Sequence, residues 1–200
     1  LVGSEMCIRD RDTYIPFCEW FIFPYVSWSP LLVVLGIYLI LKDAEGFRRY
    51  MWFIMVTFTT AVVFCILVPN GQDLRPAVMA HHNAATWLVE YTYSIDTNTN
   101  VFPSMHILGC MAAVAAVWHT PGLRKPGWRW GVTLYAILIM AATVFVKQHF
   151  LLDTFAGIIL GEVAVTLSLK TNAWKLMDKI HFKLLRLLKS VSYTHLTLPT

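Results

Sequence analysis

Long runs of apolar residues, separated by short polar segments, make up most of this chain. Three of the runs contain no charged residue: Phe21–Leu41, Tyr50–Val68 and Trp130–Val146. Two more, Ser104–Trp118 and Phe150–Leu169, are apolar with polar residues at one end. Because a helix needs about 20 apolar residues to cross a bilayer, each run is expected to form one span. The pattern therefore predicts an all-α, polytopic transmembrane helical bundle with five visible spans.

The composition indicates the same class of protein. Hydrophobic residues make up 57% of the chain and charged residues 14%, against about 45–50% and about 25% in soluble domains. This balance excludes a soluble globular protein. The few cysteines form neither a disulfide framework nor the spacing of a metal site, and the net charge of +4 is divided among separate loops. We expect no metal, no cofactor and no nucleic-acid partner, and the sequence favours no particular oligomeric state.

Basic residues alternate between the segments that join the apolar runs. Three segments are rich in Lys and Arg: 42–50, 119–129 and 170–189. The long loop Pro69–Val101 carries only Arg75. Since cytoplasmic loops are enriched in Lys and Arg, we expect the basic segments inside, and the long loop and the Lys147–Asp153 corner outside. The five spans then alternate without exception.

The two ends of the chain differ from their neighbours in composition. Residues 1–11 and 190–200 read as translated sequencing adapter, the two strands of one transposon end, and are excluded from the fold prediction. Residues 12–170 form the membrane domain, which by the alternation begins outside. We therefore expect one more span before residue 12, giving six in the intact protein. Residues 171–189 are expected to form a basic amphipathic cytoplasmic tail, either at the lipid interface or solvated.

Three polar clusters lie at the expected outer ends of the spans, at residues 70–76, 102–106 and 147–153. In the second cluster, Pro103 suits the first turn of a helix, where its missing N–H costs nothing. The backbone N–H groups around Ser104 are then free, and the positive end of such a helix binds phosphate readily. His106 follows within reach of a group bound there.

The other two clusters offer a nucleophile and a cation. His149 and Asp153 are four residues apart, which places them on one face of a helix. A carboxylate that accepts from one imidazole nitrogen fixes the tautomer and leaves the other nitrogen free to attack. Arg75 carries a planar guanidinium that suits phosphate oxygens.

These residues together resemble the three-part signature of the type-2 phosphatidate phosphatase superfamily, in the order Arg75-Pro76, Pro103-Ser104-x-His106 and His149-x-x-x-Asp153. The superfamily also contains inositol phosphorylceramide synthases and soluble vanadium haloperoxidases. The strings YSIDTNTNVFPSMH and FVKQHFLLD are similar to a bacterial membrane branch. The resemblance covers residues 12–170 and implies a phosphatase domain there.

The resemblance also implies roles for the residues. His149 is the nucleophile that takes the phosphoryl group, Asp153 orients it, and His106 protonates the leaving group. Ser104 and Arg75 hold the phosphate. The implied protein is a metal-independent lipid phosphate phosphatase, multi-pass in a bacterial cell membrane, whose site is on the non-cytoplasmic side and whose substrate is a lipid phosphate.

Two cations of the superfamily pattern are absent. Val68 stands where the pattern has a lysine, and Thr143 stands where it has an arginine. Lys147 is a candidate replacement as a phosphate ligand. Further candidates are loop residues: Asn70, Gln72, His81 and His82.

Glu162 is a carboxylate deep in a span, about half a turn around the helix from Asp153. We expect it to point away from the catalytic face, in a protonated or paired structural role.

Two other functions remain open. A phosphotransferase of the inositol phosphorylceramide synthase type would share the phosphohistidine step and pass the group to an alcohol instead of water. A transporter without chemistry would place its polar residues near the midplane on broken helices, whereas the clusters here lie at span ends. The spans exclude the soluble haloperoxidases.

Overall fold

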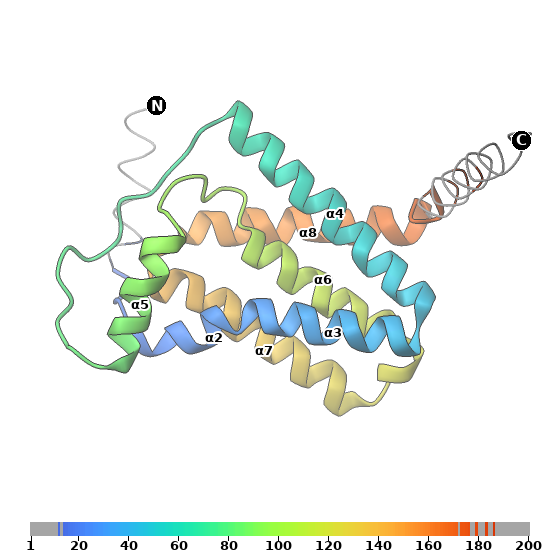
Figure 1. The fold of residues 1–200 in the computed structure, drawn as a ribbon, viewed down its shortest axis with the longest axis horizontal. Helices are drawn as coiled ribbons and strands as arrows, with labels where there is room; N and C mark the ends of the chain where they lie inside the picture. The colour runs from blue at the N-terminus through green and yellow to red at the C-terminus, as the bar shows by residue number, and fades with distance from the viewer. Residues whose placement is uncertain are drawn as a thin grey trace, which may run out of the picture.

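The computed structural model describes residues 12, 14–171, 173–176, 179, 183 and 186, and within them the chain is a bundle of helices (Figure 1). The elements are η1 Glu19–Phe21, α2 Ile22–Val26, α3 Trp28–Lys42, α4 Ala44–Leu67, α5 Ala84–Ile95, α6 Met105–His119, η2 Pro121–Leu123, α7 Pro126–Phe145 and α8 Leu151–Thr171. The predicted all-α membrane bundle is confirmed.

Four helical stretches of the described chain are long and apolar enough to cross a membrane: Glu19–Lys42, Ala44–Leu67, Pro126–Phe145 and Leu151–Ser168. They coincide with four of the five expected spans. The fifth, α6, has only 15 residues and is about 22 Å long, which is less than the roughly 30 Å of a hydrocarbon core. The helix predicted at Ser104–Trp118 is present, but it is too short to cross the hydrocarbon core by itself.

The short helix α6 lies in the middle of the bundle. It contacts α3, α4, α7 and α8. Its buried positions include Gly109, Ala112 and Ala113, small residues that let neighbouring helices approach closely. The central position of α6 explains why a helix too short to span the membrane alone still belongs to the core.

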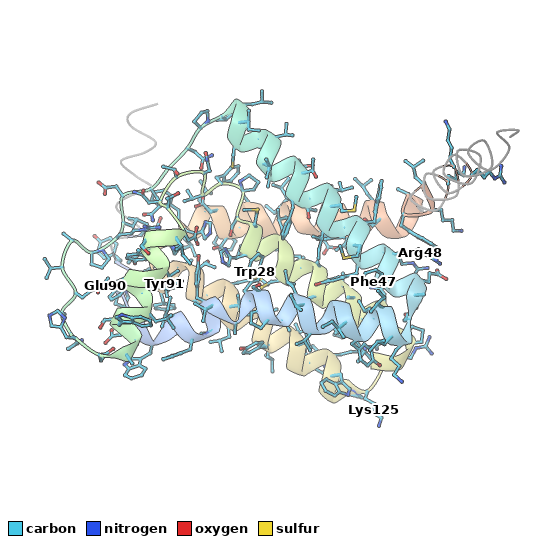
Figure 2. The ribbon with its side chains drawn as sticks, in the orientation of Figure 1. Trp28, Phe47, Arg48, Glu90, Tyr91 and Lys125 are labelled. Carbon is cyan, nitrogen blue, oxygen red and sulfur yellow. The ribbon has the colours of Figure 1, made fainter. Side chains whose placement is uncertain are left out.

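The basic segments gather at one end of the bundle. Figure 2 shows Arg48 and Lys125 toward one end, and Glu90 and Tyr91 at the other. The guanidinium groups of Arg48 and Arg49 lie 5.5 and 5.3 Å from the ring centroid of Trp174. The α4 start and the chain after α8 are therefore in contact, as expected for segments on one side of a membrane.

Helix α5 was not predicted, because the segment Pro69–Val101 reads as a loop. Its start is a capping box: the Asn83 side chain accepts from Thr86 N at 2.9 Å, and Asn83 N donates to Thr86 Oγ1 at 2.8 Å. The part of this signal that the sequence shows is Asn83, a preferred N-cap residue. The buried residues Ala85 and Val89 pack in one cluster with residues of α2 and α7. Helix α5 therefore covers the end of the bundle opposite the basic segments (Figure 1).

Several predictions fall outside the described residues or at the surface. Segments 1–11 and 190–200 lie outside them, as does much of the tail 171–189. In the described part of that tail, Trp174 is buried. Glu162 is exposed on α8 while Asp153 is buried, which agrees with the expectation that Glu162 points away from the catalytic face; its protonated or paired role stays a prediction.

The orientation in the membrane is tested by labelling single cysteines at the two ends of the bundle. With the native cysteines replaced, Thr97→Cys and Gly127→Cys are treated in intact cells with a membrane-impermeant maleimide. Both positions are exposed. Because Gly127 lies in a basic segment, Thr97→Cys is expected to react and Gly127→Cys only after lysis. The opposite result would place the α5 end in the cytoplasm.

Candidate active site

The site is built around the corner between α7 and α8. Helix α7 ends with two hydrogen bonds, from Lys147 N to Val144 O at 3.0 Å and from Gln148 N to Thr143 O at 3.0 Å. This pair of bonds ends a helix when the residue after the C-cap has a left-handed conformation. The C-cap is Val146, and Lys147 after it has φ 56°. His149 N also donates to Thr143 O. The corner therefore fixes the backbone of His149 directly.

His149 precedes α8, which begins at Leu151. The expectation that His149 and Asp153 share a helical face is wrong, because the left-handed turn ends α7 and α8 has not yet started. The two side chains still approach: His149 Nδ1 lies 3.7 Å from Asp153 Oδ2. That distance is longer than a hydrogen bond. Asp153 Oδ2 accepts from Phe150 N at 2.9 Å, which holds the carboxylate beside the ring.

The two nitrogens of His149 have different surroundings. Nε2 lies 3.1 Å from Ser104 Oγ. Nδ1 is buried and has no hydrogen-bond partner among the described residues, and its nearest carboxylate is that of Asp153. A proton on Nδ1 would therefore face Asp153, and the lone pair on Nε2 would face Ser104.

Ser104 is the N-cap of α6 and is fully buried. Its backbone is extended, with φ −68° and ψ 116°, and its Oγ lies 3.5 Å from Ile107 N. Pro103 therefore precedes the cap and is not in the first turn, contrary to expectation. Serine is a preferred N-cap because its hydroxyl accepts from a free N–H, so the helix begins after Ser104. The start of α6 is still directed at His149.

His106 lies on the first turn of α6 between two aromatic rings. Its ring centroid is 4.5 Å from that of Tyr25 and 4.4 Å from that of Trp28. The centroid of His149 is 5.7 Å away. Trp28 fits there because Gly109 faces it: a Cβ on Gly109 would lie 2.5 Å from Trp28 Nε1. The aromatic walls from α2 and α3 were not predicted, since no sequence motif links them to His106.

A cavity of about 50 Å³ joins the two histidines to the loop that follows α5. Its lining residues are Asp96, Thr97, Thr99, Asn100, Val101, Met105, His106, Gln148 and His149. The structure thus brings together His106, His149 and the start of α6. Asp96 and Gln148 are polar wall residues that were not singled out from the sequence.

Arg75 lies behind this wall. Its guanidinium donates to Tyr93 O at 3.1 Å, to Asp96 O at 2.5 Å and to Gln148 Oε1 at 2.5 Å. It also stacks 4.2 Å from the centroid of the Tyr93 ring. Arg75 therefore reaches the cavity through Gln148 and is not itself among the lining residues.

Lys147 points elsewhere. Its Nζ donates to Asp12 O at 2.6 Å and to Ile15 O at 2.5 Å. Burial lowers the pKa of Lys147, and the charge of Asp12 opposes this shift. Lys147 is not among the residues that line the cavity, so the structure does not bring this candidate phosphate ligand together with the histidines.

The remaining loop candidates hold the backbone or lie at the surface. Asn70 Oδ1 accepts from Phe102 N, and Gln72 Nε2 donates to Lys147 O at 2.8 Å. His81 pairs with Glu19 at 3.2 Å, and His82 is exposed.

The two positions that depart from the superfamily pattern are also placed by the fold. Val68 lies half-exposed at the end of α4. Thr143 is fully buried beneath the corner. Across the described residues, no group of three or more His, Cys, Asp or Glu side chains is placed to hold a metal ion.

Comparisons with known proteins place this site in a family. The model of the PAP2 superfamily matches residues 49–176, and the chain belongs to that superfamily. The crystal structure of Aquifex aeolicus LpxE is similar in fold, with a TM-score of 0.56 and 22% sequence identity over 76% of this chain and 85% of that one. No curated protein matches the chain. The family and the membrane fold support a lipid phosphatase.

The contact between Gly109 and Trp28 allows a test of whether the packing of Trp28 against His106 matters for activity. Gly109→Ala would force Trp28 off its position against His106. Overpacking of this kind costs about 1–3 kcal/mol, and a misplacement of about 1 Å at a catalytic group can lower the rate about a hundredfold. We expect kcat/KM for phosphate release to fall about tenfold to a hundredfold.

The matched control is Gly131→Ala in α7, where no described atom lies within 4 Å of the added Cβ. This change should keep activity and stabilise the helix by about 0.5–1 kcal/mol. Equal activity of the two variants would show that the position of Trp28 does not matter to the reaction.

Proposed function

We propose that this protein hydrolyses a membrane lipid phosphate through a phosphohistidine on His149, without a metal ion, on the non-cytoplasmic side. The observation that carries the proposal is the arrangement of two histidines on one cavity. His149 presents Nε2 toward Ser104, and His106 lies on the same wall.

In the first step, His149 Nε2 attacks phosphorus and the bond to the lipid oxygen breaks. His106, whose proton the negative charge of the bound phosphate would stabilise, gives that proton to the leaving oxygen. In the second step, His106 accepts a proton from water, whose oxygen attacks phosphorus and releases His149 with inorganic phosphate. Asp153 stabilises the positive charge that develops on the ring through the proton on Nδ1. The 3.7 Å between them would shorten as the charge forms, since catalytic hydrogen bonds often tighten in the substrate complex.

In this proposal the start of α6 holds the phosphate oxygens, and Arg75 attracts them from behind Gln148. The first N–H groups of a helix have no partner within it and bind phosphate with the helix dipole. The Ser104 hydroxyl turns from Nε2 to an oxygen of the substrate. Arg75 supplies the positive charge from behind Gln148. Lys147 would join only by leaving the carbonyls of Asp12 and Ile15.

A substrate anchored in the outer leaflet suits the surroundings of the cavity. Helix α5 exposes Trp87 and Tyr91, whose rings stack 5.8 Å apart. Such aromatic residues favour the head-group level of a membrane. Asp96, which caps the end of α5, lines the cavity. A lipid phosphate at that level would therefore lie near the cavity.

The roles of the histidines predict different losses. His149→Ala should abolish phosphate release, because in this proposal the phosphoryl group is transferred to His149 Nε2. His106→Ala should slow it about a hundredfold to ten-thousandfold, and less for an aryl phosphate, whose leaving group needs no proton. The measurement is inorganic phosphate released in detergent micelles by the full-length enzyme, with and without EDTA.

The matched control is His119→Ala at the opposite end of α6, where the side chain is exposed, and it should keep normal activity. Activity of His149→Ala at the wild-type level would reject the phosphohistidine. Inhibition by EDTA that added divalent cation reverses would reject the metal-independent reaction.

The small positive charge around the cavity predicts which of two lipid substrates is cleaved faster. Arg75 is the cation bonded to the cavity wall, and the wall contains the carboxylate of Asp96. A lipid monophosphate such as phosphatidate should therefore be cleaved faster than a polyprenyl pyrophosphate, which carries more negative charge. Phosphate release is compared for the two lipids in matched micelles. A tenfold preference for the pyrophosphate would contradict this prediction, and product formed only with an added alcohol would indicate a phosphotransferase.

A further inference from the structure

Gln148 lies between a cation and an anion at the wall of the cavity. Its side chain is 2% exposed. Oε1 accepts from Arg75 NH2 at 2.5 Å, and Nε2 lies 3.3 Å from Asp96 Oδ2. The next residue in the chain is His149. The amide is thus in contact with two charged side chains of opposite sign, Arg75 and Asp96, directly beside His149 in the chain.

The orientation of this amide follows from its two neighbours. A guanidinium only donates hydrogen bonds and a carboxylate only accepts them. Turning the amide over would put its NH2 group against Arg75 and its oxygen against Asp96. Asp96 is itself held by the hydroxyl of Tyr25. The amide oxygen is therefore fixed on Arg75.

The guanidinium of Arg75 cannot easily move around Gln148. It donates to two backbone carbonyls, Tyr93 O and Asp96 O, and stacks on the Tyr93 ring. Arg75 NH2 is the donor bonded to the lining residue Gln148, whereas Arg75 Nε is buried without a partner among the described residues. A phosphate oxygen that approaches Arg75 NH2 from the cavity would take the place of Gln148 Oε1. The amide oxygen and the phosphate oxygen are therefore competitors for one N–H.

From this geometry we propose that Gln148 is a specificity-determining residue, which limits how strongly Arg75 attracts a phosphate group in the cavity. The inference rests on the proposed function. The amide shields part of the Arg75 charge, so that a phosphate of low charge binds while the product phosphate is still released. The charge of residue 148 would then set the affinity of the site for inorganic phosphate.

The proposal predicts effects of opposite sign for two substitutions. Gln148→Ala removes the competitor and should tighten the binding of inorganic phosphate. Gln148→Glu keeps the shape, pairs with Arg75 and adds a negative charge, so it should weaken that binding. Hydrogen bonds to charged groups contribute about 1.5–3 kcal/mol, so each change in affinity should be about tenfold or more. A purely structural role predicts losses in the same direction that follow the change in Tm.

Gln72 provides the matched control. It is also a buried glutamine, 4% exposed, and its Nε2 donates to Lys147 O of the same corner. It is not among the residues that line the cavity. Gln72→Ala and Gln72→Glu should lower Tm without shifting the affinity for phosphate in opposite directions.

The experiment uses the full-length enzyme in detergent micelles. The inhibition constant of inorganic phosphate, the kcat and KM for a lipid monophosphate, and Tm are measured for wild type and the four variants. We expect Gln148→Ala to lower the inhibition constant and Gln148→Glu to raise it. In an Arg75→Ala background, Gln148→Ala should have no effect, because the two residues act through one interaction. If Gln148→Ala does not fold, Gln148→Asn, whose amide is too short to reach Arg75, should give the same sign.

The outcomes separate this inference from the function on which it rests. If wild type releases phosphate but both Gln148 variants shift the inhibition constant in the same direction, the role of Gln148 is rejected and the phosphatase stands. The same holds if the Gln72 variants reproduce the opposite shifts. If wild type neither releases phosphate from lipids nor binds inorganic phosphate, both proposals are rejected.

Discussion

The left-handed turn at Lys147 holds the backbone of His149, and the rest of the candidate site is arranged around it. A non-glycine residue in this conformation costs about 1–2 kcal/mol. Three groups offset that cost. Lys147 Nζ donates to the carbonyls of Asp12 and Ile15, Gln72 donates to Lys147 O, and Tyr93 donates to Val146 O. The N-terminal segment, the long loop and α5 therefore all meet at the corner between α7 and α8.

In this arrangement Lys147 has a structural role instead of the phosphate-binding role that its charge suggests. As a cation near His149 in the sequence, it is a natural candidate for a phosphate ligand. In the fold, the charge is used to bind the two N-terminal carbonyls, and the backbone carries His149 into place. Arg75 is likewise bound to protein groups, yet one of these, Gln148, lines the cavity. Under the proposed function, the Arg75 charge would therefore reach a phosphate through Gln148, and the helix dipole of α6 would add to it.

The sequence predicted the parts of the fold that follow from local pattern. The apolar runs predicted the membrane helices, and the motifs predicted Ser104, His106 and His149. The two histidines line one cavity, and Ser104 Oγ lies within hydrogen-bond distance of His149 Nε2. The parts that were missed depend on tertiary contacts. Trp28 lies against His106 only because Gly109 leaves room, and Lys147 adopts a turn usually taken by glycine. Helix α5 was missed because its 12 residues form only a short amphipathic pattern among polar residues. The preferred N-cap residue Asn83 is a weak signal by itself.

The length of α6 determines how deep the site lies. Its last residue and the start of α4 line a common cavity at the basic end, so α6 ends at the level where α4 begins. Helix α4 has 24 residues and α6 has 15, which makes α6 about 13 Å shorter. The loop before Ser104 covers that difference, with Phe102 against Phe64 of α4. Ser104 and its neighbour His149 therefore lie nearer to the basic end of the bundle than Leu67, the last residue of α4. Burial of charge is costly unless the charge is paired, so under the proposed function the limited positive charge of the cavity would suit a phosphate of low charge on a lipid that already lies in the bilayer.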